Sequence, residues 1–188
     1  MINIAIEVLE KASEGDIAAF EEVYKAASSF VYNVALKITR NSAEAEEVTQ
    51  DVFMKIYHKL KDFDFRSAFK TWLYRITVNT AINQYNKSQR DVKDRVDYDG
   101  IVESLPGSSS TEKNAIQSEN EQRLNILLDA LSPEHKACLI LREIEGLSYE
   151  EIAAALKIPV NTVRSRLKRA REALLEKAGK GLLKDEMR

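Results

Sequence analysis

Two helical segments separated by a short break, near the C-terminus, constrain the fold of this chain more than any other feature. The sequence SYEE at 148–151 has the pattern of a capping box, in which the serine and the glutamate each satisfy a backbone N–H of the other. It opens the short segment EEIAAALKI, which leads into the break KIP at 157–159, and Asn161 is then a suitable N-cap for a longer helix. Two helices joined by a short turn predict a helix-turn-helix.

The longer helix is strongly basic on all but one side. Four apolar residues cluster within about 60° on a helical wheel and predict a buried stripe: Val163, Leu167, Ala170 and Leu174. The rest of the circumference carries Arg164, Arg166, Lys168, Arg169, Arg171 and the acid Glu172. Such a helix fits the major groove, where arginine donates two hydrogen bonds to guanine and other basic side chains pair with phosphates. We therefore expect DNA binding, and a solvated charged helix in an ordinary bundle is the alternative.

Basic charge is segregated along a chain whose net charge is −2. Residues 61–90 contain six basic and two acidic residues, and residues 159–188 contain nine basic and four acidic residues. The segments 1–60 and 91–158 are acidic. This distribution indicates two contact surfaces for a polyanion.

The rest of the chain is typical of an all-α protein. Asp16 can cap a helix that ends near residue 40, and a second helix begins at about Ser42 with apolar residues at four-residue steps. A third covers the stretch from about 68 to 87, in which Trp72 has the spacing of a core residue. The opposite arc of the second helix is acidic and polar, and a solvated face is its simplest interpretation.

Periodicity fails over residues 91–118, where Pro106 and Gly107 precede three serines. We expect a flexible linker there. The predicted architecture is two small helical domains, 1–90 and 119–188, joined by this linker.

The sequence contains no residue pattern that is typical of an enzyme active site or a metal site. Cys138 is the only cysteine, and His58 and His135 have no partner at metal-ligand spacing. A catalytic pair of Cys138 and His135 is conceivable, but Cys138 lies in the apolar run ACLIL and is expected to be buried. We expect no metal, no cofactor and no enzymatic activity. Without a signal peptide or a long apolar run, we expect a cytoplasmic protein with no membrane insertion.

Both halves resemble one family. LSPEHKACLILREIEGLSYEEIAAALKIPVNTVRSRLKRAREAL is similar to the promoter-reading domain of the extracytoplasmic-function (ECF) sigma factors of bacterial RNA polymerase. AEEVTQDVFMKIYHKL resembles the helix of this family that binds core polymerase, and FRSAFKTWLYRITVNTAINQYNK resembles its segment that melts and reads the −10 element. The resemblance covers most of residues 5–90 and 120–178. It implies an alternative sigma factor that directs promoter-specific initiation, with an anti-sigma factor as a further partner.

The resemblance also implies three sets of contact residues. Those facing the clamp helices of core polymerase are Glu46, Glu47, Gln50 and Asp51. Those binding the melted −10 element are Phe63, Phe65, Arg66, Lys70, Arg75, Asn79 and Asn83, with Lys87 and Arg90 at phosphates. Those binding the −35 duplex are Arg164, Ser165, Lys168 and Arg169 at the bases, and Asn161, Thr162, Arg166 and Arg171 at phosphates.

Two other functions account for part of the sequence. A free-standing, dimeric helix-turn-helix regulator would use the C-terminal half alone, and it leaves the acidic helix and the second basic segment unexplained. A sigma mimic that sequesters a partner would keep the helices but would not need DNA-reading residues, and the bases from Arg164 to Arg171 are all present.

Overall fold

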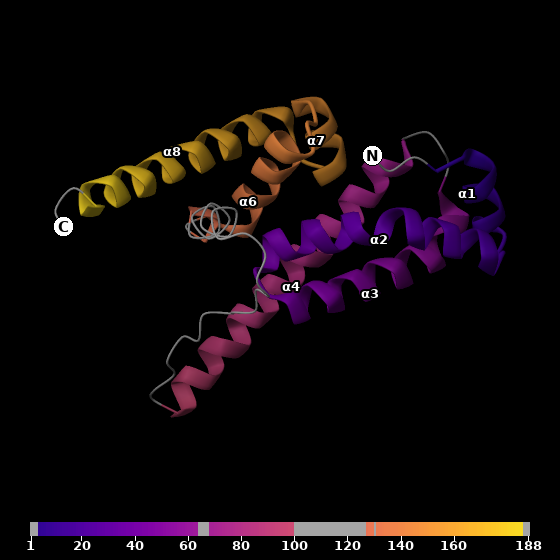
Figure 1. Ribbon diagram of the computed structural model, residues 1–188, viewed down its shortest axis with the longest axis horizontal. Coiled ribbons are helices and arrows are strands. Elements are labelled where there is room, and N and C mark those ends of the chain that lie inside the picture. The colour runs from indigo at the N-terminus through magenta and orange to yellow at the C-terminus, as the bar shows by residue number, and fades with distance from the viewer. Residues whose placement is uncertain (1–3, 64–67, 100–126, 130, 186–188) are drawn as a thin grey trace. The chain divides into compact units, whose positions relative to one another are not determined.

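The computed structural model describes residues 4–63, 68–99, 127–129 and 131–185 (Figure 1). The protein is all-α, as predicted, and no strand occurs within these ranges. The chain falls into two compact units: the first covers it to residue 100, and most of residues 101–188 form the second. Nowhere in the described ranges is a helix both long enough and apolar enough to cross a membrane.

The first unit contains α1 (Ile6–Ser13), α2 (Ile17–Thr39), α3 (Ser42–Lys59), the 3₁₀ turn η1 (Leu60–Asp62) and α4 (Phe69–Asp99). Helices α2 and α3 lie antiparallel, and α4 packs against both (Figure 1). The core comes from their apolar stripes, which are fully buried at Val23, Val34, Val52, Ile56 and Leu73. Helix α1 was not predicted, and it is held by burial of Leu9 and Ala12.

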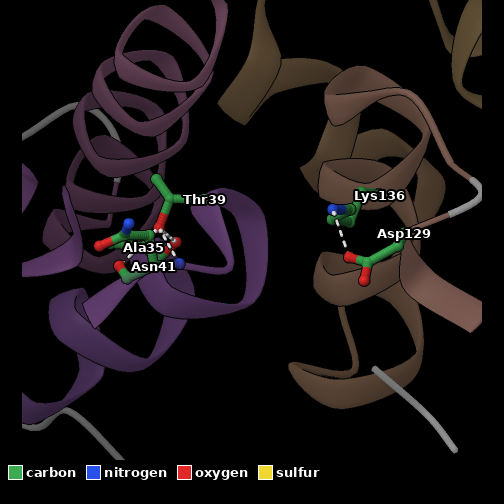
Figure 2. Close-up of polar contacts among 5 residues, drawn as sticks. All are labelled: Ala35, Thr39, Asn41, Asp129 and Lys136. Carbon is green, nitrogen blue, oxygen red and sulfur yellow. Dashed lines mark hydrogen bonds and ion pairs between the residues drawn. The ribbon is translucent and has the colours of Figure 1, made fainter. Parts of the chain in front are cut away.

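Local polar contacts set the corner between α2 and α3. Asp16 caps α2 as predicted, because its carboxylate accepts a hydrogen bond from the Ala19 N–H at 3.0 Å. At the other end, the Thr39 hydroxyl lies 3.0 Å from the Ala35 carbonyl and 3.2 Å from the Asn41 carbonyl (Figure 2). The Asn41 side chain then caps α3 by accepting from the Glu44 N–H at 3.1 Å. These contacts allow the chain to reverse within two residues.

Helix α4 continues to Asp99, so the predicted helix end near residue 87 is too early, and the helix extends over the first nine residues of the expected linker. The prediction relied on the loss of apolar periodicity, which indicates that a helix has no face to bury and not that the helix ends. From 69 to 99 the sequence contains neither glycine nor proline, the residues that interrupt helices, and the next glycine is at 100. The remainder of the expected linker lies outside the described residues.

The second unit contains α6 (Pro133–Leu139), the π-helical turn η2 (Ile140–Ile144), α7 (Tyr149–Leu156) and α8 (Val160–Asp185). Ser132 caps α6, and Pro133 occupies its first turn. Lys136 is almost fully buried, and its ammonium lies 3.9 Å from the Asp129 carboxylate, which connects α6 to the segment before it (Figure 2). The π-helical turn was not predicted, and Gly146 with φ of 72° follows it.

The predicted helix-turn-helix is confirmed in α7 and α8. The capping box is present: the Ser148 N–H donates to the Glu151 carboxylate at 2.7 Å, and the Glu151 N–H donates to the Ser148 hydroxyl at 3.1 Å. The predicted N-cap of α8 is wrong, because the Pro159 carbonyl accepts from the Thr162 and Val163 N–H groups and thus begins the helix. Asn161 therefore lies in the first turn.

Candidate nucleic-acid and protein interfaces

Helix α3 presents the acidic face that the sequence predicts. Glu46, Glu47, Gln50 and Asp51 are all exposed, while Val48 and the rest of the apolar stripe are buried. Two large side chains extend the exposed face, Met54 at 59% exposure and Tyr57 at 47%. The face therefore combines carboxylates with an exposed methionine and an exposed tyrosine, two residue types that are enriched at protein interfaces.

The acidic face has two sides with different neighbours. On one side, Glu46 and Gln50 line a groove of about 530 Å³ between α2 and α3. The α2 wall of the groove is aromatic and polar: Tyr24, Ser28, Ser29, Tyr32 and Asn33. The Tyr24 ring rests on Phe53 with centroids 4.6 Å apart, and it remains 46% exposed. Carboxylate, amide and aromatic rings around one opening form a suitable receptor for a basic side chain.

On its other side, α3 is bonded to α4 by a polar ladder. Lys55 donates to the Thr80 hydroxyl at 3.0 Å, Gln84 donates to the Glu47 carboxylate at 2.6 Å, and Ser88 donates to the Glu44 carboxylate at 2.7 Å. Partial burial raises the pKa of Glu44, and the Ser88 hydrogen bond opposes that rise. The rungs on α4 are four residues apart, so they lie on one side of the helix.

The next stripe of α4, one residue before each rung, is open to solvent. Asn79, Asn83 and Lys87 are exposed there, and Arg90 is exposed one turn further on. Arg75 is half-buried, and the Lys70 ammonium lies 5.4 Å from the centroid of the Tyr74 ring. The ladder thus fixes α4 in an orientation that exposes the two predicted asparagines.

The aromatic residues before α4 form a packed cluster. Phe63 lies 5.1 Å from Trp72 and 6.1 Å from Phe69, measured between ring centroids, and is only 7% exposed. Trp72 is 8% exposed, in agreement with the predicted core role. The prediction that Phe63 meets DNA directly is therefore not supported, because its ring faces the cluster. Phe65 and Arg66 lie outside the described residues.

Helix α8 is oriented as the helical wheel predicts. Val163, Leu167 and Ala170 are at most 1% exposed, whereas the four predicted base contacts are all exposed. These four are Arg164, Ser165, Lys168 and Arg169. Arg164 donates within its own helix to the Asn161 side chain at 3.2 Å, and Lys168 lies 3.8 Å from Glu172. Thr162 is half-buried. A basic face directed away from the domain core is thus present.

Arg166 does not belong to this outward face. It is half-buried, and it forms a hydrogen bond with Cys138, which is fully buried in α6. Burial raises the pKa of the Cys138 thiol, and burial together with Arg166 lowers the pKa of His135. Because the Cys138 side chain is fully buried and burial disfavours its thiolate form, the structure gives no support for a catalytic pair of Cys138 and His135.

Arg171 also points toward its own domain. Its guanidinium donates to the Glu143 carboxylate at 2.7 Å and forms a second hydrogen bond with Tyr149. Sequence reasoning missed Glu143 and Tyr149 because neither has a distinctive local pattern. The described part of the chain contains no group of His, Cys, Asp or Glu arranged to hold a metal ion.

Known proteins match both units. The family described as Sigma-70 region 2 matches residues 23–91, and that described as Sigma-70, region 4 matches residues 122–174. The RNA polymerase sigma-H factor of Pseudomonas aeruginosa is 36% identical over 186 residues, which cover 95% of each chain. The ECF RNA polymerase sigma-E factor of Escherichia coli K12 is 37% identical over 176 residues, which cover 89% of this chain and 90% of that protein.

A solved structure gives the same result. The sigma factor RpoE of Bartonella quintana, in complex with the anti-sigma factor NepR, is 28% identical with a TM-score of 0.68, and the match covers 85% of this chain and 96% of that one. Both sigma regions occur here in order, on the two units that carry the acidic helix and the helix-turn-helix. The chain therefore belongs to the extracytoplasmic-function sigma factors of bacterial RNA polymerase.

Proposed function

We propose that this sigma factor docks on the clamp helices of core RNA polymerase through α3 and reads promoters with two separate helices. In this proposal α8 reads the −35 element as a duplex, and α4 with the loop before it reads the −10 element as a melted strand. One observation carries the proposal: Arg164, Ser165, Lys168 and Arg169 are all exposed opposite a fully buried stripe of α8. The functional domains would be residues 1–90 for docking and −10 reading, and 119–188 for −35 reading.

Docking is supported by the composition of the exposed face of α3. Glu46, Glu47, Gln50 and Asp51 would meet basic residues of the clamp helices, and exposed Met54 and Tyr57 would add apolar contact area. Complementary charge of this kind contributes more to association rate and register than to affinity. We therefore assign partner selection to the carboxylates and most of the affinity to the apolar side chains and the groove beside them.

Reading of the −10 strand is supported by the exposed stripe of α4. Asn79 and Asn83 are one turn apart, and an amide offers both a donor and an acceptor to a base edge. Lys87 and Arg90 continue the same side of the helix toward the phosphate backbone, and Lys70 and Arg75 are placed nearer the loop. The buried Phe63 would hold that loop in place and would not itself stack on a DNA base.

Reading of the −35 duplex is supported by the outward face of α8. Arginine and lysine side chains at Arg164, Lys168 and Arg169 can reach guanine edges, and each good bidentate pair discriminates by about 1–3 kcal/mol. Asn161 and Thr162 are at the start of the helix, where phosphate contacts to backbone N–H groups are favourable.

Two further features complete the proposal. The protein would act in the cytoplasm, where its polymerase is. It would also bind an anti-sigma factor, since the structurally similar RpoE of Bartonella quintana was solved with one.

Transcription in vitro tests the proposal directly. Purified core polymerase and this protein would be incubated with a library of promoter-length fragments, and the initiated transcripts would be sequenced. The double variant Glu47→Arg/Asp51→Arg should lose initiation. The matched control Glu10→Arg/Glu22→Arg reverses the same amount of charge at exposed positions of α1 and α2 and should retain it. A protein that binds DNA as a dimer and never directs initiation would overturn the proposal in favour of the free-standing regulator.

A further inference from the structure

We propose that Arg171 is a positioning residue of the recognition helix: through Glu143 and Tyr149 it fixes the angle at which α8 is presented, and it does not contact DNA. This inference rests on the proposed reading of the −35 element by α8. It reassigns one basic residue of the helix from a DNA contact to a contact within the protein.

The contacts of Arg171 join three elements. The guanidinium is 2.7 Å from the carboxylate of Glu143 in η2, a residue 28 positions earlier in the sequence. Its second hydrogen bond goes to Tyr149, the first residue of α7. The Tyr149 ring in turn has the Arg142 guanidinium 5.1 Å from its centroid, and Arg142 donates to the Leu147 carbonyl at 2.7 Å. A single network thus connects η2, the turn after it, α7 and α8.

The position of this network explains why it would set an angle. The short turn joins the end of α7 to the start of α8, so it fixes the two helices at one point only. Tyr149 is at the opposite end of α7, and Arg171 is about three turns into α8. A hydrogen bond between these two positions attaches the helices at a second point, and it therefore limits the angle that α8 can adopt relative to α7.

Arg164 provides the contrast within the same helix. Arg164 and Arg171 are seven residues apart and therefore lie on nearly the same side of α8. Arg164 bonds only one turn back, to Asn161, and can leave that contact without disturbing any other element. To reach a phosphate, Arg171 would have to break its hydrogen bonds to both η2 and α7. The Glu143 carboxylate, which is half exposed beside it, would also repel that phosphate.

The two roles predict opposite effects for Glu143→Gln. If Arg171 binds phosphate, removing the competing carboxylate should tighten DNA binding. If Arg171 positions the helix, the same change should weaken binding by about two- to fivefold, the range of an exposed ion pair. Glu150→Gln is the matched control, because it removes an equal charge from an exposed position of the same unit.

The measurement is the equilibrium affinity of holoenzyme for a fluorescein-labelled promoter duplex recovered in the transcription selection. Titrations on ice keep the duplex closed, and a series of salt concentrations gives the slope of log affinity against log salt. We expect Glu143→Gln, Arg171→Gln and Arg171→Lys to weaken binding to a similar extent with an unchanged slope. The double variant Glu143→Gln/Arg171→Gln should be no weaker than either single variant.

A phosphate role would give a different set of results. Arg171→Gln would lower the slope by about one, Arg171→Lys would keep most of the affinity, and Glu143→Gln would bind more tightly. Any of these outcomes overturns the inference. Arg169→Ala tests the underlying function separately, because the loss of a base contact should lower the affinity. If Arg169→Ala leaves the affinity unchanged, α8 does not read DNA as proposed, and the proposed function fails whatever Arg171 does.

Discussion

Leu167 and Leu175 provide a matched test of how α8 is held in the second unit. Leu167 is 1% exposed and belongs to the buried stripe, whereas Leu175 is 72% exposed on the same helix. Truncation of each to alanine removes the same atoms. At Leu167 the change also leaves a cavity, and buried leucine-to-alanine changes cost about 2–5 kcal/mol. At Leu175 no packing is lost, so a cost within about 0.5 kcal/mol is expected.

The expected loss is large for a small unit. Domains retain about 0.05–0.15 kcal/mol of stability per residue, so a unit of about 60 residues has about 3–9 kcal/mol in total. Leu167→Ala should therefore remove at least about a fifth of the stability of the second unit, and Leu175→Ala should leave it nearly unchanged.

Urea denaturation followed by two signals measures both effects. Trp72, the only tryptophan of the sequence, lies in the first unit, so its fluorescence reports on that unit. Far-UV circular dichroism reports on the helices of both. The unfolding of the second unit appears as the part of the dichroism change that is not accompanied by a change in Trp72 fluorescence. We expect Leu167→Ala to lower the urea concentration at the midpoint of that part. Equal losses for the two variants, or a loss below about 1 kcal/mol at Leu167, would refute the packing assigned to α8.

Three further predictions concern titration, readout and reactivity. Because the pKa of Glu44 is raised in the folded state, its contribution to stability is present below about pH 4.5 and is lost as the pH rises through the raised pKa. In thermal melts, Glu44→Gln should therefore become more stable relative to wild type over that pH range. A stability difference that does not change with pH would contradict the direction of the pKa shift. Arg164→Ala should cost about 1–3 kcal/mol at preferred promoters and relax selectivity at one −35 base in the transcription selection, whereas an unchanged set of promoters would remove it from base reading. Cys138 should react with a thiol reagent only at the rate of unfolding, so fast labelling of the native protein would disprove its burial.

Local features of the fold could be predicted from sequence because their causes are local. The Asp16 cap, the Ser148 capping box and the buried stripe through Leu167 each depend on residues within one or two turns. Helix boundaries that depend on the backbone conformation of the preceding residues were harder to predict. Asn161 has the chemistry of an N-cap, but the rigid Pro159 begins the helix first, after Lys157 adopts a positive φ of 53°.

The candidate sites divide in the same way. Exposure of Glu47 and Arg169 follows from helical periodicity and was predicted correctly. The partners of Arg171 and Phe63 were not, because each depends on a tertiary contact. An arginine on a basic helix has the same sequence signature whether it meets a phosphate or a glutamate 28 residues away. An aromatic residue on a loop gives no local sign of whether it will pack into a cluster.

The polar ladder on α4 also bears on how such a protein could be redesigned. Its rungs at Thr80, Gln84 and Ser88 hold α4 on α3, while Asn79, Asn83 and Lys87 lie one position earlier in each turn. Two tasks therefore alternate along one helix without sharing a residue. If the outward positions read the −10 strand as proposed, a library that randomises only them would explore new promoter preferences on an unchanged scaffold. The same library shifted by one residue would remove the hydrogen bonds that join α4 to α3. A shift of one residue in the randomised positions would therefore decide whether a library changes the exposed face of α4 or the contacts that stabilise it.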